Sequence, residues 1–191
     1  MGLLVNIANL VTLLRLLLAP VVIWLLLDGQ SGAAFALFLF AGITDAIDGM
    51  IAKRFNQLTE LGAYLDPIAD KVLLVSIFVT LGVLQALPVW LVLLAVSRDA
   101  LIVGGVLLSY TLGNPLVMKP LLISKANTVA QIALVAAVLA HKAFPEFQTA
   151  AAITALEFAV WLTAATTAAS GGAYIVTWVK AMNPSAANTD L

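Results

Sequence analysis

Long apolar runs alternate with short polar segments along almost the whole chain. Reading those runs against Gly, Pro and clustered charges predicts six membrane-spanning helices. The predicted spans are Thr12–Leu27, Ala33–Ala52, Leu65–Leu84, Pro88–Tyr110, Ser124–Ala140 and Ala150–Val179. The preceding stretch, Asn6–Leu14, predicts a short amphipathic interfacial helix. The pattern therefore predicts an all-α integral membrane protein.

The sequence shows no internal repeat and no sign of a second domain. We expect residues 1–182 to form a single membrane domain, followed by a polar tail over residues 183–191. The first apolar run contains Arg15, and no basic segment precedes it, so it does not resemble a cleaved secretory signal.

Composition supports the membrane class. Hydrophobic residues make up 63% of the 191 positions and charged residues only 10%, which is unlike a soluble domain. The chain has no cysteine, which excludes disulfides and thiolate metal sites. The net charge is −1 and there is no basic run, so we expect no nucleic-acid partner.

Basic residues indicate the orientation of the predicted spans, because they concentrate on the cytoplasmic side of membranes. With a cytoplasmic N-terminus, the outward links hold only Lys142, whereas the inward positions hold Lys53, Arg54, Lys119, Lys125 and Lys180. This asymmetry predicts that both termini face the cytoplasm, and we expect a bacterial inner membrane.

Four aspartates lie in or beside apolar spans two and three. A carboxylate at membrane depth costs roughly 2.5–3.5 kcal/mol, so four impose on the order of 10 kcal/mol that cations must offset. Asp45 and Asp48 are three residues apart and Asp66 and Asp70 are four apart, so each pair shares one helix face. Their hard oxygens favour Mg²⁺ or Mn²⁺, or else Ca²⁺.

The aspartates have two other interpretations. They could form ion pairs with bases such as Lys53, Arg54, Lys71 and Arg98, or they could line the path of a divalent cation transporter. Transporters usually place ion sites near the midplane on interrupted helices of repeated halves. Here the acids are predicted to lie towards one membrane face, which favours metal binding by an enzyme.

The aspartates belong to a longer pattern, Asp45-x2-Asp48-Gly49-x2-Ala52-Lys53-x8-Gly62-x3-Asp66-x3-Asp70. This pattern resembles the signature of the CDP-alcohol phosphotransferase family at every spacing. The one departure is Lys53, where the family usually has arginine; lysine keeps the charge but loses bidentate geometry. Six helices with an amphipathic lead-in are also similar to that family.

The resemblance implies roles for the matched residues. Two divalent ions, Mg²⁺ or Mn²⁺, would be held by Asp45, Asp48 and Asp66 against the diphosphate of CDP-diacylglycerol. Asp70 would be the catalytic base, and it is also a candidate metal ligand. Gly49, Ala52, Lys53 and Gly62 would contact the nucleotide. For the glycines, helix packing is an equally good explanation. The resemblance further implies a homodimer.

The second half of the chain bears on the acceptor alcohol. The segments Ser97–Asp99, Lys119–Gln131 and Thr163–Ser170 are similar to those of cardiolipin synthases, which implies phosphatidylglycerol as acceptor; the alternative is glycerol 3-phosphate. Arg98, Lys119 and Lys125 are candidates to bind an acceptor phosphate. Arg98 could instead pair with Asp99, and the lysines could simply mark a cytoplasmic loop. Asn127 could be an acceptor ligand or an interhelical hydrogen-bond partner.

Overall fold

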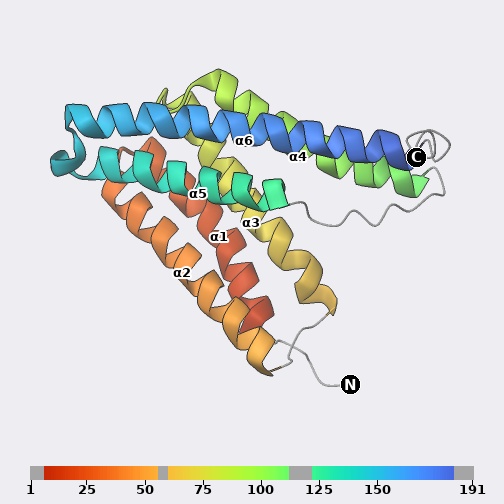
Figure 1. Cartoon of the computed structure of the whole chain (residues 1–191). Helices are drawn as coiled ribbons and strands as arrows, with labels where there is room; N and C mark the ends of the chain where they lie inside the picture. Colours follow the sequence, from red (N-terminus) through yellow and green to blue (C-terminus); the bar gives the residue numbers. More distant parts are fainter. Residues whose placement is uncertain (1–6, 56–59, 112–121, 183–191) are drawn as a thin grey trace. The chain divides into compact units, whose positions relative to one another are not determined.

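A computed structural model describes residues 7–55, 60–111 and 122–182 of the chain. Within these ranges the chain forms α-helices joined by short turns and contains no strand, which confirms the all-α prediction (Figure 1). The elements are α1 (Ile7–Leu27), α2 (Ser31–Phe55), α3 (Glu60–Val83), α4 (Val89–Thr111), α5 (Leu122–Ala143), the 3₁₀ turn η1 (Pro145–Phe147) and α6 (Ala150–Met182).

The N-terminal helix differs from the prediction. α1 runs without a break from Ile7 to Leu27, so the predicted lead-in and the first apolar span are one helix. The prediction of a separate interfacial helix over Asn6–Leu14 is therefore wrong. No glycine or proline stands between Ile7 and Ala19 to end a helix, and Asn9 lies inside α1. Asn6 lies outside the described residues.

Two of the described helices have the length and composition of membrane spans. Among the described residues, Leu122–Ala143 and Ala150–Val179 are long and apolar enough to cross a bilayer, and Leu14–Leu27 and Ser31–Thr44 are shorter apolar stretches. The described part of the chain thus has six α-helices, while six membrane spans remain a prediction.

Gly29 makes the turn that returns α2 along α1. Its backbone is left-handed, with a φ of 77°, a conformation that glycine adopts without steric cost. The amide of Gln30 donates to the carbonyl of Leu25 at 2.8 Å across this turn, which closes the C-terminus of α1. α2 then starts at Ser31.

The internal contacts divide the chain into two compact units. The first unit comprises Met1–Leu87 and Val135–Ile153, and the second comprises Pro88–Leu134 and Thr154–Leu191. α5 and α6 each contribute residues to both units. The single membrane domain predicted over residues 1–182 stays a prediction, and the tail at 183–191 lies outside the described residues.

In the first unit, α1 packs against both α2 and α3 (Figure 1). Apolar side chains from all three helices are buried there, among them Val22 and Leu26 of α1, Ala34 of α2, and Ile77 and Leu81 of α3. Phe144, just after α5, meets Phe35 of α2 edge-on at 5.7 Å between ring centroids. α1 is therefore the helix around which the first unit is built.

Two adjacent leucines of α1 test this packing. Leu26 is 2% exposed and Leu27 is 58% exposed. Leu26→Ala should destabilise the protein by about 2–5 kcal/mol, because truncation leaves a cavity in a packed core. Leu27→Ala, the matched control, should change stability by less than about 0.5 kcal/mol. Thermal unfolding of the detergent-solubilised protein measures both, and equal effects would show that α1 does not pack as described.

Candidate functional site

The two aspartate pairs lie on helices, as the spacing predicts. Asp45 and Asp48 belong to α2, and Asp66 and Asp70 belong to α3. Residues three or four apart on a helix share a face, so each pair can present its carboxylates together. The side chains of Asp45, Asp48 and Asp66 lie outside the described residues. The contacts of the motif's side chains are therefore known for Asp70 alone among the four aspartates.

Asp70 forms an ion pair with Arg15, which joins α3 to α1. A terminal guanidinium nitrogen of Arg15 donates to the Asp70 Oδ1 atom. The Arg15 side chain is 4% exposed, whereas that of Asp70 is 47% exposed. The carboxylate is thus anchored from the buried side by α1 and remains accessible from the other side. A charge-assisted hydrogen bond of this kind restricts the position of the carboxylate.

Sequence reasoning did not assign Arg15 to the site. It used this arginine only to argue against a secretory signal and did not include it among the possible partners of the acids. A signal for its role was present, because an arginine inside an apolar helix requires a partner at the same depth. What the sequence does not contain is the packing of α1 on α3, which brings positions 55 residues apart into contact.

The residues predicted to contact the nucleotide lie near the C-terminal end of α2 and the N-terminal end of α3. Gly49, Ala52 and Lys53 lie near the C-terminus of α2, and Gly62 lies in the first turn of α3. Their side chains lie outside the described residues, so their contact with a nucleotide stays a prediction.

A second polar centre surrounds Arg98 of α4 in the second unit. Arg98 is 5% exposed, and its Nη1 donates to the Asp99 carboxylate at 2.7 Å. Its Nε donates to the Ser170 hydroxyl of α6 at 3.1 Å, and its Nη2 donates to the hydroxyls of Ser124 and Ser170. The guanidinium carbon lies 5.6 Å from the centre of the Tyr174 ring, within cation–π range. Arg98 therefore links α4 to α5 and α6.

These contacts bear on the three candidate acceptor residues. The pairing of Arg98 with Asp99, considered from the sequence, is confirmed. Arg98 donates to Ser124, so it lies beside the start of α5. Lys125 is the next residue of α5, and its side chain is exposed. Lys119 lies outside the described residues. Contact of any of the three with an acceptor phosphate stays a prediction.

Asn127 continues the polar centre between α5 and α6. Its Oδ1 accepts from the Thr167 hydroxyl at 2.7 Å and from the Thr166 hydroxyl at 3.1 Å. Of the two interpretations of Asn127, the interhelical hydrogen bond is the one that the structure shows, and contact with an acceptor stays untested. In apolar surroundings such bonds hold helices in one register, because slippage would leave buried polar atoms unpaired.

The donor chemistry of the aspartate motif fits a hard divalent ion. Four carboxylates without histidine or cysteine match the preference of Mg²⁺ or Mn²⁺. The described residues alone contain no group of three potential metal ligands, since three of the four aspartates fall outside them. Asp70, the aspartate of the motif whose side chain the structure describes, has a cationic partner in Arg15, and a guanidinium repels a metal ion placed beside it.

Comparison with known proteins identifies the class to which this helical, aspartate-bearing chain belongs. Residues 5–169 match the CDP-alcohol phosphatidyltransferase family, so the chain is a member of that family. This confirms the resemblance drawn from the spacing of the aspartates.

Three relatives are similar to this chain over most of its length. The chain is 39% identical to a cardiolipin synthase (CMP-forming) of Rattus norvegicus over 88% of this chain, and 38% identical to that of Homo sapiens over the same share. It is 35% identical to the chloroplastic CDP-diacylglycerol–glycerol-3-phosphate 3-phosphatidyltransferase 1 of Oryza sativa subsp. japonica, also over 88% of this chain. The alignments cover 60%, 60% and 56% of these relatives, so the chain spans less than two thirds of their length.

The Arg98 centre generates a stability prediction. Arg98→Lys keeps the positive charge but cannot reach Asp99, Ser124 and Ser170 together, so it should cost about 1.5–3 kcal/mol, the worth of a hydrogen bond to a charged group. Lys125→Gln, at an exposed position on α5, should have little effect. Thermal unfolding without any acceptor measures both. An unchanged midpoint for Arg98→Lys would show that Arg98 does not hold the three helices together.

Proposed function

We propose that the protein transfers a phosphatidyl group from CDP-diacylglycerol to the hydroxyl of phosphatidylglycerol, forming cardiolipin and CMP. The observation that carries this proposal is the aspartate motif on α2 and α3 in a chain of the CDP-alcohol phosphatidyltransferase family. The similarity to the rat and human cardiolipin synthases over 88% of the chain supports phosphatidylglycerol as acceptor.

A second acceptor has its own support. The rice relative is named for glycerol 3-phosphate and is 35% identical over the same share of this chain. Glycerol 3-phosphate is therefore the alternative acceptor, and phosphatidylglycerophosphate would be the product. Cation transport, the competing class considered from the sequence, is not supported by these relatives.

In the proposed reaction, the acceptor oxygen forms a new bond to the phosphatidyl phosphorus while the bond from that phosphorus to CMP breaks. Asp70 takes the proton of the acceptor hydroxyl, and CMP leaves with the bonding electrons. Two divalent ions, held by Asp45, Asp48 and Asp66, would supply charge neutralisation to the diphosphate. Gly49, Ala52, Lys53 and Gly62 would bind the nucleotide.

The Arg15 ion pair supports the role of Asp70 as base rather than as a fourth metal ligand. A general base must lie within hydrogen-bond reach of the proton it removes and must keep its orientation. Arg15 fixes one carboxylate oxygen from the buried side, while nearly half of the Asp70 side chain stays accessible. We infer that Arg15 positions Asp70 towards the acceptor.

Placement in the membrane is part of the proposal. Two helices of bilayer length, together with the apolar stretches of α1 and α2, support a multi-spanning protein. We propose six spans with both termini and the aspartates on the cytoplasmic side of a bacterial inner membrane, and assembly as a homodimer.

The function is tested by giving purified protein CDP-diacylglycerol and Mg²⁺ or Mn²⁺ with one acceptor at a time. We expect CMP release that depends on the acceptor, with cardiolipin formed from phosphatidylglycerol. Phosphatidylglycerophosphate as the dominant product when both acceptors are present at equal concentration would replace the first acceptor with the second. No CMP release with either acceptor, from folded protein, would contradict the proposal.

Removing a metal ligand should abolish this activity. Asp45→Asn, Asp48→Asn and Asp66→Asn each replace a hard anionic oxygen with an amide, so Mn²⁺ binding should weaken and CMP release should fall to background. Titration with Mn²⁺ and a CMP assay measure the two effects. Glu146→Gln on η1, outside the motif, serves as the control and should leave both unchanged. Wild-type affinity and turnover in all three variants would end the two-metal proposal.

Asp70 should behave differently from the other aspartates. Asp70→Asn cannot accept a proton, so turnover should fall by about 10²–10⁴-fold. CDP-diacylglycerol should still raise the thermal midpoint of this variant, since a ligand that binds the folded state stabilises it. If the midpoint no longer responds to CDP-diacylglycerol, Asp70 serves substrate binding and its assignment as base is wrong.

A further inference from the structure

All three guanidinium nitrogens of Arg98 donate hydrogen bonds inside the second unit. Nε and Nη2, which form one edge of the guanidinium, both donate to the Ser170 hydroxyl of α6. Nη1 and Nη2, which form the other edge, donate to the Asp99 carboxylate of α4 and the Ser124 hydroxyl of α5. Arginine recognises a phosphate best through the paired N–H groups of one such edge. Both edges of Arg98 are therefore occupied by protein groups.

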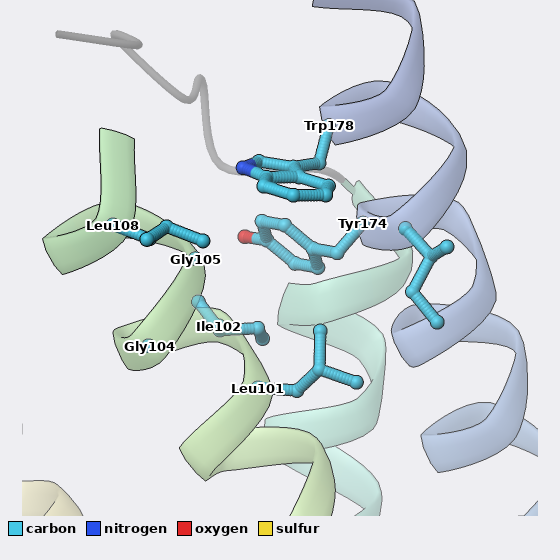
Figure 2. A pocket seen from close by; sticks show the side chains of 8 residues that line it. Leu101, Ile102, Gly104, Gly105, Leu108, Tyr174 and Trp178 are labelled. Carbon is cyan, nitrogen blue, oxygen red and sulfur yellow. The ribbon is translucent and has the colours of Figure 1, made fainter. Parts of the chain in front are cut away.

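The rest of the Arg98 side chain is enclosed, since the residue is only 5% exposed. The guanidinium carbon lies 5.6 Å from the ring centre of Tyr174, and Tyr174 itself lines an apolar groove between α4 and α6 together with Trp178 (Figure 2). A Cβ atom added at Gly171 would lie 3.6 Å from the Arg98 Cγ atom, so the stem of Arg98 packs against α6. A phosphate can reach this arginine only by displacing its protein partners.

The positive charge of Arg98 is also balanced within the protein. Nη1 lies 2.7 Å from the Asp99 carboxylate, whose side chain is 14% exposed. Opposite charges this close largely cancel at the distance of an approaching anion. In the part of the second unit whose side chains the structure describes, the other basic residue is Lys125, and it is exposed. Lys125 therefore supplies the positive charge that an anion can reach there.

Arg98 fixes the part of α5 that carries this lysine. Lys125 follows Ser124 in the first turn of α5, and the Ser124 hydroxyl accepts from Arg98. Through the same guanidinium the start of α5 is tied to α4 and to Ser170 of α6. Because a lysine side chain is long and flexible, a fixed backbone lowers the entropy that it loses when it binds a ligand.

We propose that Arg98 is a positioning residue, which holds the start of α5 through Ser124 so that Lys125, and not Arg98, binds the acceptor phosphate. One ammonium group matches the single negative charge of a phosphodiester, whereas a phosphomonoester carries about −1.5 to −2 at pH 7. The site then selects a phosphodiester acceptor by its charge. This proposal rests on the transfer reaction proposed above and names the residue and the charge that choose its acceptor.

The charge is tested with two soluble acceptors, glycerol 3-phosphate and glycerol 3-(methyl phosphate). The second is a phosphodiester without acyl chains, so the pair differs by a methyl group and a negative charge. With CDP-diacylglycerol and Mn²⁺, the wild type should use the diester with a kcat/KM about tenfold higher, because the second charge of the monoester has to be desolvated without a matching ammonium. Lys125→Gln should raise the KM for the diester by about 10–100-fold and leave kcat nearly unchanged.

The positioning role is tested with Ser124→Ala, which leaves both Arg98 and Lys125 in place. Loss of the anchor should raise the KM for the diester by about two- to tenfold, as expected for one hydrogen bond. In the Lys125→Gln background the same substitution should have no further effect, because Ser124 acts through Lys125. Lys142→Gln, the same change as Lys125→Gln but in the last turn of α5, is the control and should leave the KM unchanged.

The rise in thermal midpoint that the diester produces is measured beside the KM, because it requires no turnover. A midpoint rise that is lost in Lys125→Gln, without CMP release from the wild type, would end the proposed function and support Lys125 as the phosphate contact. Better use of glycerol 3-phosphate than of the diester, or an unchanged KM in Lys125→Gln, would overturn the proposal. A lower KM in Ser124→Ala, or additive effects of Ser124→Ala and Lys125→Gln, would assign the phosphate to Arg98 instead.

Discussion

A charged side chain in an apolar helix is stable only if it is paired, and this constraint organises both units. In the first unit, Arg15 of α1 is buried against Asp70 of α3. In the second, Arg98 of α4 is buried against Asp99 and the hydroxyls of Ser124 and Ser170. Apolar contacts between such helices would tolerate sliding, whereas a buried guanidinium accepts one register, since any other leaves it unpaired.

The Arg15 ion pair also gives a reason why one aspartate of the motif can differ in function from the other three. Attachment of Asp70 to α1 gives it a partner of its own. The proposed division of labour, in which three aspartates hold metal and one takes a proton, rests on this attachment of Asp70 to Arg15.

The sequence predicted the parts of the fold and site that depend on local pattern. Apolar runs ended by Gly, Pro or charge marked the helices, and the three- and four-residue spacings placed Asp45 with Asp48 and Asp66 with Asp70 on α2 and α3. The family followed from the same spacings and was confirmed. The predicted start of α1 is wrong, because no glycine or proline between Ile7 and Ala19 separates a lead-in from the first apolar span.

Contacts between helices distant in the chain could not be predicted from the sequence pattern. The partner of Arg15 and the linkage of Arg98 to α6 each depend on how helices pack, which periodicity along one helix does not specify.

Counting bound ions tests most directly whether Asp70 is not a metal ligand. Electron paramagnetic resonance of Mn²⁺ bound to purified protein gives the number of ions per chain. We expect two ions in the wild type, two in Asp70→Asn, and fewer in Asp66→Asn. Loss of Mn²⁺ from Asp70→Asn to the same extent as from Asp66→Asn would contradict this expectation.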